Sequence, residues 1–199
     1  MTGQPLFCPP IQDIPEIDMS QNALKQALER TIGVVSNDPA KARLLFRTRS
    51  RLLDGVRCSA EVRDFPPIVV DEPAELGGSN AGPNPVELVL VALATCQEIM
   101  YAAYAAVLGI PLEAVEVNVK GELDVRGLFG LDESVPAGYR KVSFETVIKS
   151  PADLATIRDL VARVEAHCPV LDTLIRPVEV AGTVTVNGTL LNTPVNHAV

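Results

Sequence analysis

Four cysteines are the residues of this sequence best suited to nucleophilic or redox chemistry, and two of them stand in settings that favour it. A buried free cysteine usually only fills space. We interpret Cys8, in a Pro-rich N-terminal arm, and Cys58, in a predicted strand, in that way. Cys96 lies in the middle of a long apolar helix, and Cys168 extends the apolar stripe of a later one. If both helices cover one sheet, these thiols face the same core although they are 72 positions apart.

Cys168 is followed directly by Pro169, and a proline disfavours α conformation in the residue before it. If a new helical turn begins at Pro169, the Cys168 sulfur lies at a helix N-terminus, where a thiolate is stabilised. On this argument alone Cys168 would be the nucleophile. The neighbouring His167 is either a base for that thiol or a residue that complements the helix dipole, and we interpret it as structural.

Other reactive sites have little support in the composition. The chain holds two histidines, His167 and His197, and no C-x-x-C motif, which argues against imidazole-rich metal sites, zinc ribbons and thioredoxin-type motifs. Its formal net charge of -8 argues against a nucleic-acid surface or a polybasic membrane patch. We therefore expect no cofactor, no metal, no nucleic-acid partner and no membrane partner.

The length of 199 residues, with 47% hydrophobic residues, predicts one sizeable domain with its own core. The N-terminus lacks the basic and apolar regions of a signal peptide. The segment from Leu88 to Ile110 is apolar enough to be a membrane span, but Gln97 and Glu98 interrupt it, and we interpret it as a helix buried in protein. The expected location is cytoplasmic.

The first 40 residues form a predicted extension with one helix, and residues 41–199 form the domain. Asp18 has the pattern of an N-cap, with Gln21 in capping-box position, and the helix is expected to end at Gly33. Strands are then predicted around an Asp-Gly turn, at Arg43–Asp54, Arg57–Arg63 and Ile68–Val70.

A Gly-rich loop leads into the helix that carries Cys96. Asn84 is its predicted N-cap, Pro85 occupies the first helical position and Glu87 completes a capping box. The helix should end near Leu108, before Gly109. It is apolar nearly all round, which is typical of a helix covered on every side.

The second half of the chain alternates strand, helix and strand. A half-buried strand from Val115 toward Val125 and a partner strand, Val142–Ile148, flank a predicted loop at 127–138. Asp153 lies in the predicted cap of the next helix, and a last strand is expected at Val178–Val186. The helix's apolar stripe is predicted to consist of Leu154, Ile157, Val161, Val164 and Cys168. Runs of antiparallel strands with packed helices indicate the α+β class.

Two motifs in this order resemble the OsmC/Ohr family over about residues 43–187. The first is GGSNAGPNPVELVLVALATC, a Gly-rich loop, an N-P pair and an apolar helix with a cysteine eleven residues after the proline. The second is HCPVLDTL, a cysteine followed by proline at the end of a later helix, and DEPAELGG resembles the OsmC-like branch. The resemblance implies an OsmC-like fold, with antiparallel sheets packed around a long central buried helix in an intertwined homodimer.

The resemblance also implies a reaction, the thiol-dependent reduction of organic hydroperoxides in oxidative-stress defence. Cys96 would be the peroxidatic cysteine, oxidised to a sulfenic acid, and Cys168 would resolve it as an intramolecular disulfide. A dithiol reductant, lipoyl- or thioredoxin-like, would restore both thiols. Leu93, Met100 and Tyr101, about a turn from Cys96, would line an apolar entrance for the peroxide. A buried Cys96 needs a nearby cation to ionise.

This sequence departs from the family's best-known members in the residues that supply that cation. There, an arginine of the first hairpin is steadied by a glutamate directly after the N-P proline. Here Val86 occupies the glutamate position. Glu87 is the next residue, about 100° further around the helix. It either steadies the arginine or serves only in the capping box. Leu53 occupies the position of the arginine, so we take the nearby Arg51 as the candidate cation. Alternatively, Arg51 is only a surface residue of an edge strand.

Two further functions remain open on the sequence. The fold could serve as a binding protein, with an apolar interfacial cleft for a lipid-like ligand and redox-inert thiols. It could also be a redox sensor whose disulfide changes a partner surface.

Overall fold

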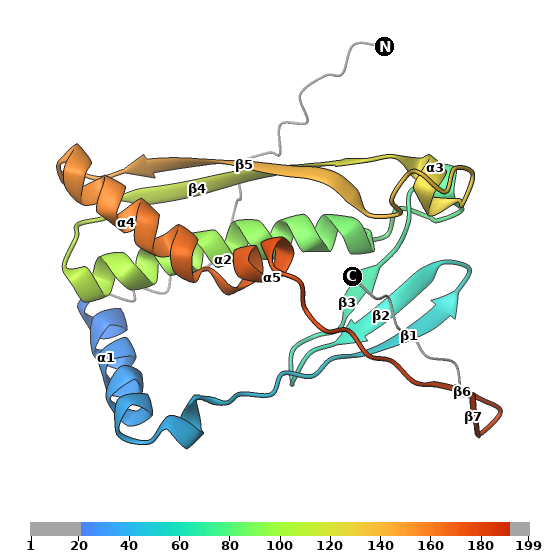
Figure 1. The fold of residues 1–199 in the computed structure, drawn as a ribbon, viewed down its shortest axis with the longest axis horizontal. Coiled ribbons are helices and arrows are strands. Elements are labelled where there is room, and N and C mark those ends of the chain that lie inside the picture. The colour runs from blue at the N-terminus through green and yellow to red at the C-terminus, as the bar shows by residue number, and fades with distance from the viewer. Residues whose placement is uncertain (1–20, 192–199) are drawn as a thin grey trace, which may run out of the picture.

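The computed structural model describes residues 21–191 (Figure 1). Helix α1 (Gln21–Asn37) packs against α2 (Pro85–Leu108), and the Gln21 Nε2 amide donates to the Ile110 carbonyl at 2.7 Å. The predicted stop at Gly33 is wrong, because α1 continues for another turn to Asn37. A glycine inside a helix costs about 1 kcal/mol, which packing against a neighbouring helix can offset. The predicted cap Asp18 lies outside the described residues.

A three-stranded antiparallel sheet follows the short 3-10 helix η1 (Pro39–Ala42). Its order is β1 (Arg49–Asp54), β2 (Arg57–Glu61) and β3 (Ile68–Val70), and Gly55, with φ of +49°, makes the predicted turn. The prediction that the first strand begins at Arg43 is wrong. Strand β2 ends opposite Arg49, so residues 43–48 have no partner strand to pair with.

The Gly-rich loop between β3 and α2, which contains η2 (Ala74–Leu76), is folded around the carboxylate of Asp71. This side chain is 1% exposed and accepts four hydrogen bonds. The donors are the backbone N–H groups of Glu72, Ser79 and Ala81 and the Ser79 hydroxyl, at 2.7–3.1 Å. These hydrogen bonds, the one from the Ser79 hydroxyl first, hold the pKa of Asp71 well below its usual range. Gly78 is required in this loop because a Cβ there would collide with the Glu72 carbonyl.

Helix α2 begins and ends as the sequence predicts. The Asn84 side chain accepts from the Glu87 N–H at 2.9 Å, the Glu87 carboxylate accepts from the Asn84 N–H at 2.8 Å, and Gly109 ends the helix with a positive φ. Among the described residues α2 is the one helix long and apolar enough, by length and composition, to cross a membrane. Its packing against β4, α1, α4 and α5 gives that composition a role in the core of the fold.

The long antiparallel pair β4 (Ala114–Leu123) and β5 (Tyr139–Lys149) runs alongside α2, while α4 (Leu154–His167) and α5 (Pro169–Ile175) lie across the same helix (Figure 1). Asp153 caps α4 through bonds from the Ala155 and Thr156 N–H groups. The core where these elements meet consists of Tyr101, Ala105, Ile110, Leu160 and Val164.

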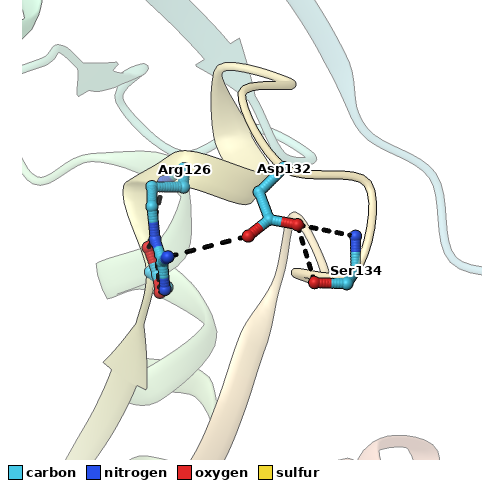
Figure 2. A network of polar contacts seen from close by, with 4 residues as sticks. Arg126, Asp132 and Ser134 are labelled. Carbon is cyan, nitrogen blue, oxygen red and sulfur yellow. Dashed lines mark hydrogen bonds and ion pairs between the residues drawn. The ribbon is translucent and has the colours of Figure 1, made fainter.

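The predicted loop at 127–138 is an ordered connection with a short helix, α3 (Val125–Leu128), at its start. Figure 2 shows the polar network that organises it. Arg126 forms an ion pair with Asp124 and a longer one with Asp132, at 3.6 Å. The Asp132 carboxylate also accepts hydrogen bonds from the Ser134 N–H at 3.0 Å and from the Ser134 hydroxyl at 2.6 Å. The network joins the start of the connection between β4 and β5 to its middle.

Three expectations about burial and strands are corrected. Leu154, the first residue of α4, is 81% exposed, and Leu160 takes its place in the buried stripe, one turn before Val164 on the same face. The expected last strand at Val178–Val186 is reduced to β6 (Val184–Val186), which pairs with β7 (Thr189–Leu191) in a small exposed hairpin. Within one chain α2 is not covered on every side, since Val91 and Ile99 are 51% and 66% exposed.

We predict that Asp71→Asn destabilises the protein strongly at pH 7, because an amide has one acceptor oxygen and places an NH₂ donor against donors. The pKa of Asp71 is lower in the folded state than its unfolded value of about 3.9. The ionised carboxylate therefore contributes to the free energy of unfolding above that pH, and this contribution is lost as the pH falls below it. The urea midpoints of wild type and variant should therefore converge in acid. Asp64→Asn, at an exposed aspartate, is the control; equal midpoints for both variants at pH 7 would contradict the prediction.

Candidate thiol site

Cys96 and Cys168 meet where α2 contacts the junction of α4 and α5. Their Sγ atoms are 3.4 Å apart, and both cysteines are free thiols. A disulfide needs about 2.05 Å between the sulfurs, so a small rotation of the side chains would close it. The two sulfurs are within the reach that the sequence analysis expects. Cys96 is half-buried, whereas Cys168 has no exposed surface.

The chain brings Cys168 to this place by ending one helix and starting another. Cys168 has extended backbone angles, φ -72° and ψ 113°, as a residue before proline should. It closes α4 and is also the N-cap residue of α5, whose first position is Pro169. The predicted new helical turn at Pro169 is therefore present.

The N-terminal turn of α5 affects the pKa of Cys96. The Cys168 side chain makes no capping hydrogen bond to α5. The backbone N–H of Val170, in the first turn of α5, instead forms a hydrogen bond with Cys96 that lowers its pKa. Burial acts in the opposite direction and is the larger effect, so the pKa of Cys96 is raised overall.

A cavity of about 420 Å³ with a mostly apolar lining lies between α2, β5 and α5. Leu93, one turn before Cys96, and Leu171, one turn after Cys168, are among the residues that line it. Of the three residues expected at an apolar entrance, Leu93 alone lines this cavity. Tyr101 is buried in the core, and Met100 faces the crevice between α1 and α2.

Comparison with known proteins gives a family and a fold. The model of the family described as OsmC-like protein matches residues 77–181, a span that contains both cysteines. This chain belongs to the OsmC-like family. Among curated proteins no significant sequence match was found.

Solved structures of similar fold include other OsmC-like proteins. An OsmC-like protein from Mycoplasma pneumoniae has a TM-score of 0.57 and 21% identity, over 66% of this chain and 87% of that one. A Legionella pneumophila protein described as an organic hydroperoxide resistance protein OsmC has a TM-score of 0.52 and 23% identity, over 67% and 93%. An OsmC-like protein of unknown function from Vibrio cholerae has a TM-score of 0.54 and 13% identity, over 66% and 94%. The OsmC-like fold, of mixed helix and sheet, is thereby confirmed.

The other two candidate residues of this OsmC-like protein have partners elsewhere. Arg51 lies on β1 and pairs with Glu61 at 2.9 Å, and its sheet stands apart from the body that contains the thiols (Figure 1). Glu87 is exposed, and its carboxylate is engaged in the capping box of α2. Neither makes a hydrogen bond or ion pair with Cys96 in the described part of the chain. His167 has a structural setting, with Nδ1 2.9 Å from the Arg163 carbonyl and its ring against Tyr104.

Sequence reasoning missed two contributors to this site. The effect of the Val170 N–H on Cys96 depends on how α2 packs against α5. The sequence does not give that packing. Gln97, next to Cys96, is fully buried, and neither atom of its amide has a partner among the described residues. Its position within an apolar helix was noted only as an argument against a membrane span. No group of three or more potential metal ligands occurs in residues 21–191.

We predict that Cys96 within one folded chain ionises at higher pH than an ordinary cysteine, because burial outweighs the Val170 hydrogen bond. Alkylation of Cys96 by iodoacetamide should then accelerate as pH rises through and beyond about 8.5. The measurement is peptide mass spectrometry on the Cys168→Ser variant, diluted until its mass is monomeric, with Cys58 as an internal reference and urea-unfolded protein as the baseline. A folded midpoint below the unfolded one would show that a cation outside this environment governs Cys96.

Proposed function

We propose that this OsmC-like protein reduces organic hydroperoxides with Cys96 as the attacking thiolate and Cys168 as the resolving thiol. The observation that carries the proposal is the pair of free thiols whose sulfur atoms lie 3.4 Å apart. The description of the Legionella relative as a hydroperoxide resistance protein agrees with it.

The reaction proceeds in three balanced steps. The Cys96 thiolate attacks the terminal oxygen of ROOH, the O–O bond breaks, and ROH leaves with a proton while Cys96 becomes a sulfenic acid. The Cys168 sulfur then attacks Cys96, forming the S–S bond and releasing water. A dithiol reductant, lipoyl- or thioredoxin-like, exchanges twice with this disulfide, which returns both thiols and leaves the reductant oxidised. The net reaction converts ROOH and a dithiol into ROH, water and a disulfide.

The second proposal is that the working unit is an intertwined homodimer. The face of α2 that its own chain leaves open consists of Val91, Ala92, Thr95 and Ile99, and it lies beside Cys96 on the same helix. On β1, Leu52 and Leu53 are 67% and 52% exposed. Apolar surface of this extent marks an interface, and a two-fold dimer would cover the same patch on both copies.

Within one chain β1 does not approach α2. In a dimer, β1 of the partner could do so. Arg51 would then be the cation that offsets the burial of Cys96, provided it leaves Glu61, and Glu87 at the start of α2 would be a carboxylate to steady it. An exposed ion pair contributes at most about 1 kcal/mol, so exchange of partners costs little.

We predict that Cys96→Ser abolishes hydroperoxide consumption, because in the proposed mechanism Cys96 alone attacks the peroxide and Cys168 only resolves the sulfenic acid. Cys168→Ser should consume about one equivalent of cumene hydroperoxide per chain and then stall with Cys96 as a sulfenic acid, detectable by dimedone labelling. Cys58→Ser is the control and should retain full turnover. If Cys168→Ser abolishes the first turnover and Cys96→Ser does not, the two roles are reversed. If wild type consumes no peroxide with any dithiol, the alternative applies: a binding or redox-sensing protein.

We also predict that the protein has a dimeric mass in light scattering at micromolar concentration. Ile99→Asp, which places a charge on the open face of α2, should shift the equilibrium toward monomer. Val147→Asp is the matched control, because Val147 is 53% exposed on the polar outer face of β5. A monomeric wild type, or equal masses for the two variants, would contradict the proposed interface.

A further inference from the structure

Gln97 is a polar side chain in the middle of an apolar core. Leu93, Gln97 and Tyr101 follow one another at four-residue spacing on α2, and none of them is more than 1% exposed. Neither the nitrogen nor the oxygen of the Gln97 amide has a hydrogen-bond partner in the part of the chain that the structure describes. An amide buried without a partner destabilises a fold, and an apolar side chain of the same size avoids that cost. A partner that the amide acquires in another state of the protein would explain its presence.

The neighbours of Gln97 on α2 show which part of the molecule its side chain faces. Leu93, one turn earlier, lines the cavity formed with α5, and Tyr101, one turn later, packs in the core against α4. Gln97 therefore faces the junction of α4 and α5, where Cys168 has no exposed surface. The sulfurs of Cys96 and Cys168 lie 3.4 Å apart at this junction.

The amide of Gln97 presents an NH₂ donor and a carbonyl acceptor side by side. A thiol is weak in both roles, whereas one hydroxyl group can accept from the NH₂ and donate to the carbonyl. Oxidation of Cys96 creates such a group. The Cys96 thiolate attacks one oxygen of a peroxide, the O–O bond breaks, and the other oxygen leaves and takes up a proton. The sulfur keeps the first oxygen as S–OH, next to Gln97 in the chain.

We propose that the Gln97 amide binds the hydroxyl group of the Cys96 sulfenic acid and positions it for the resolving step. The Nε2 group donates to the sulfenic oxygen, and Oε1 accepts from its O–H. When the Cys168 sulfur attacks Cys96, the S–S bond forms and the S–O bond breaks. The departing hydroxide takes the Cys168 proton and leaves as water, and the Nε2 donor stabilises it as it departs. The inference rests on the proposed oxidation of Cys96, but on no particular hydroperoxide or reductant.

The stability of the protein in two oxidation states tests the hydrogen bonds directly. The background is the full-length Cys8→Ser/Cys58→Ser/Cys168→Ala variant, in which Cys96 is the one cysteine left. Alanine is chosen at position 168 because a serine hydroxyl could itself bind the amide. One equivalent of hydrogen peroxide converts Cys96 to the sulfenic acid, which dimedone labelling verifies.

Gln97→Met removes the amide from this background and keeps the length of the side chain. The reduced variant should melt at the same temperature as its parent or higher, because an unpaired buried amide has been removed. The sulfenic acid form of the variant should melt about 3–6 °C below that of the parent, because the new hydroxyl has lost its partner. Gln97→Leu repeats the comparison with a second apolar side chain.

The rate of disulfide formation tests the positioning role. In protein that retains all four cysteines, disulfide formation after one equivalent of hydrogen peroxide is followed by quenching with N-ethylmaleimide and mass spectrometry. Gln97→Met should slow this step about tenfold, and the sulfenic acid that dimedone traps should accumulate. Leu160→Met, a conservative change in the buried core of α4, is the control and should form the disulfide at the wild-type rate.

Equal melting temperatures for the two sulfenic acid proteins, or a wild-type rate of disulfide formation in Gln97→Met, would overturn the inference. An equal loss of stability in both oxidation states would also overturn it, because the amide would then have a permanent partner, such as a water shared with the buried Thr146 hydroxyl. If no sulfenic acid forms at Cys96, the proposed function fails and this inference fails with it. A sulfenic acid whose effect on the melting temperature is independent of Gln97 overturns this inference alone.

Discussion

The thiol site depends on the interruption of one helix at Cys168. In a continuous helix the N–H of residue 170 would bond to the carbonyl of residue 166 and would have no capacity for a side chain. Pro169 disfavours the α conformation at Cys168, so α4 ends there and α5 begins with unsatisfied N–H groups. The same break leaves the Cys168 sulfur in the buried stripe of α4, 3.4 Å from Cys96. One proline thus provides both the sulfur contact and a backbone donor.

Two opposite effects act on the pKa of Cys96, and the one that raises it is the larger. Burial between helices raises its pKa, and the Val170 N–H offsets only part of that effect. Each pKa unit corresponds to about 1.4 kcal/mol against the thiolate, so a second stabilising charge would change reactivity greatly. Within the chain, Arg51 and Glu87 are committed to Glu61 and to the α2 cap. The open apolar face of α2 beside Cys96 is where a further group can approach.

The sequence predicted the features that local chemistry decides. The capping box of Asn84 and Glu87, the Asp153 cap and the turn at Gly55 all depend on a few adjacent residues, and all are present. The predictions that failed depend on distant partners. Helix α1 passes through Gly33 because it packs on α2, and residues 43–48 form no strand because β2 is too short to pair with them. The buried stripe of α4 includes Leu160 and not Leu154, because burial depends on which positions pack against α2 and α5.

The same distinction explains why the sequence pointed to two different nucleophiles, Cys96 by family resemblance and Cys168 by its place before Pro169. An N-cap side chain ordinarily accepts a bond from the N–H of the second or third helical residue. Cys168 occupies the cap position of α5 but makes no such bond, and the N–H at the second position bonds to Cys96 from another helix. A helix N-terminus stabilises whichever anion lies in front of its N–H groups, and only the packing of α2 against α5 determines that this is Cys96.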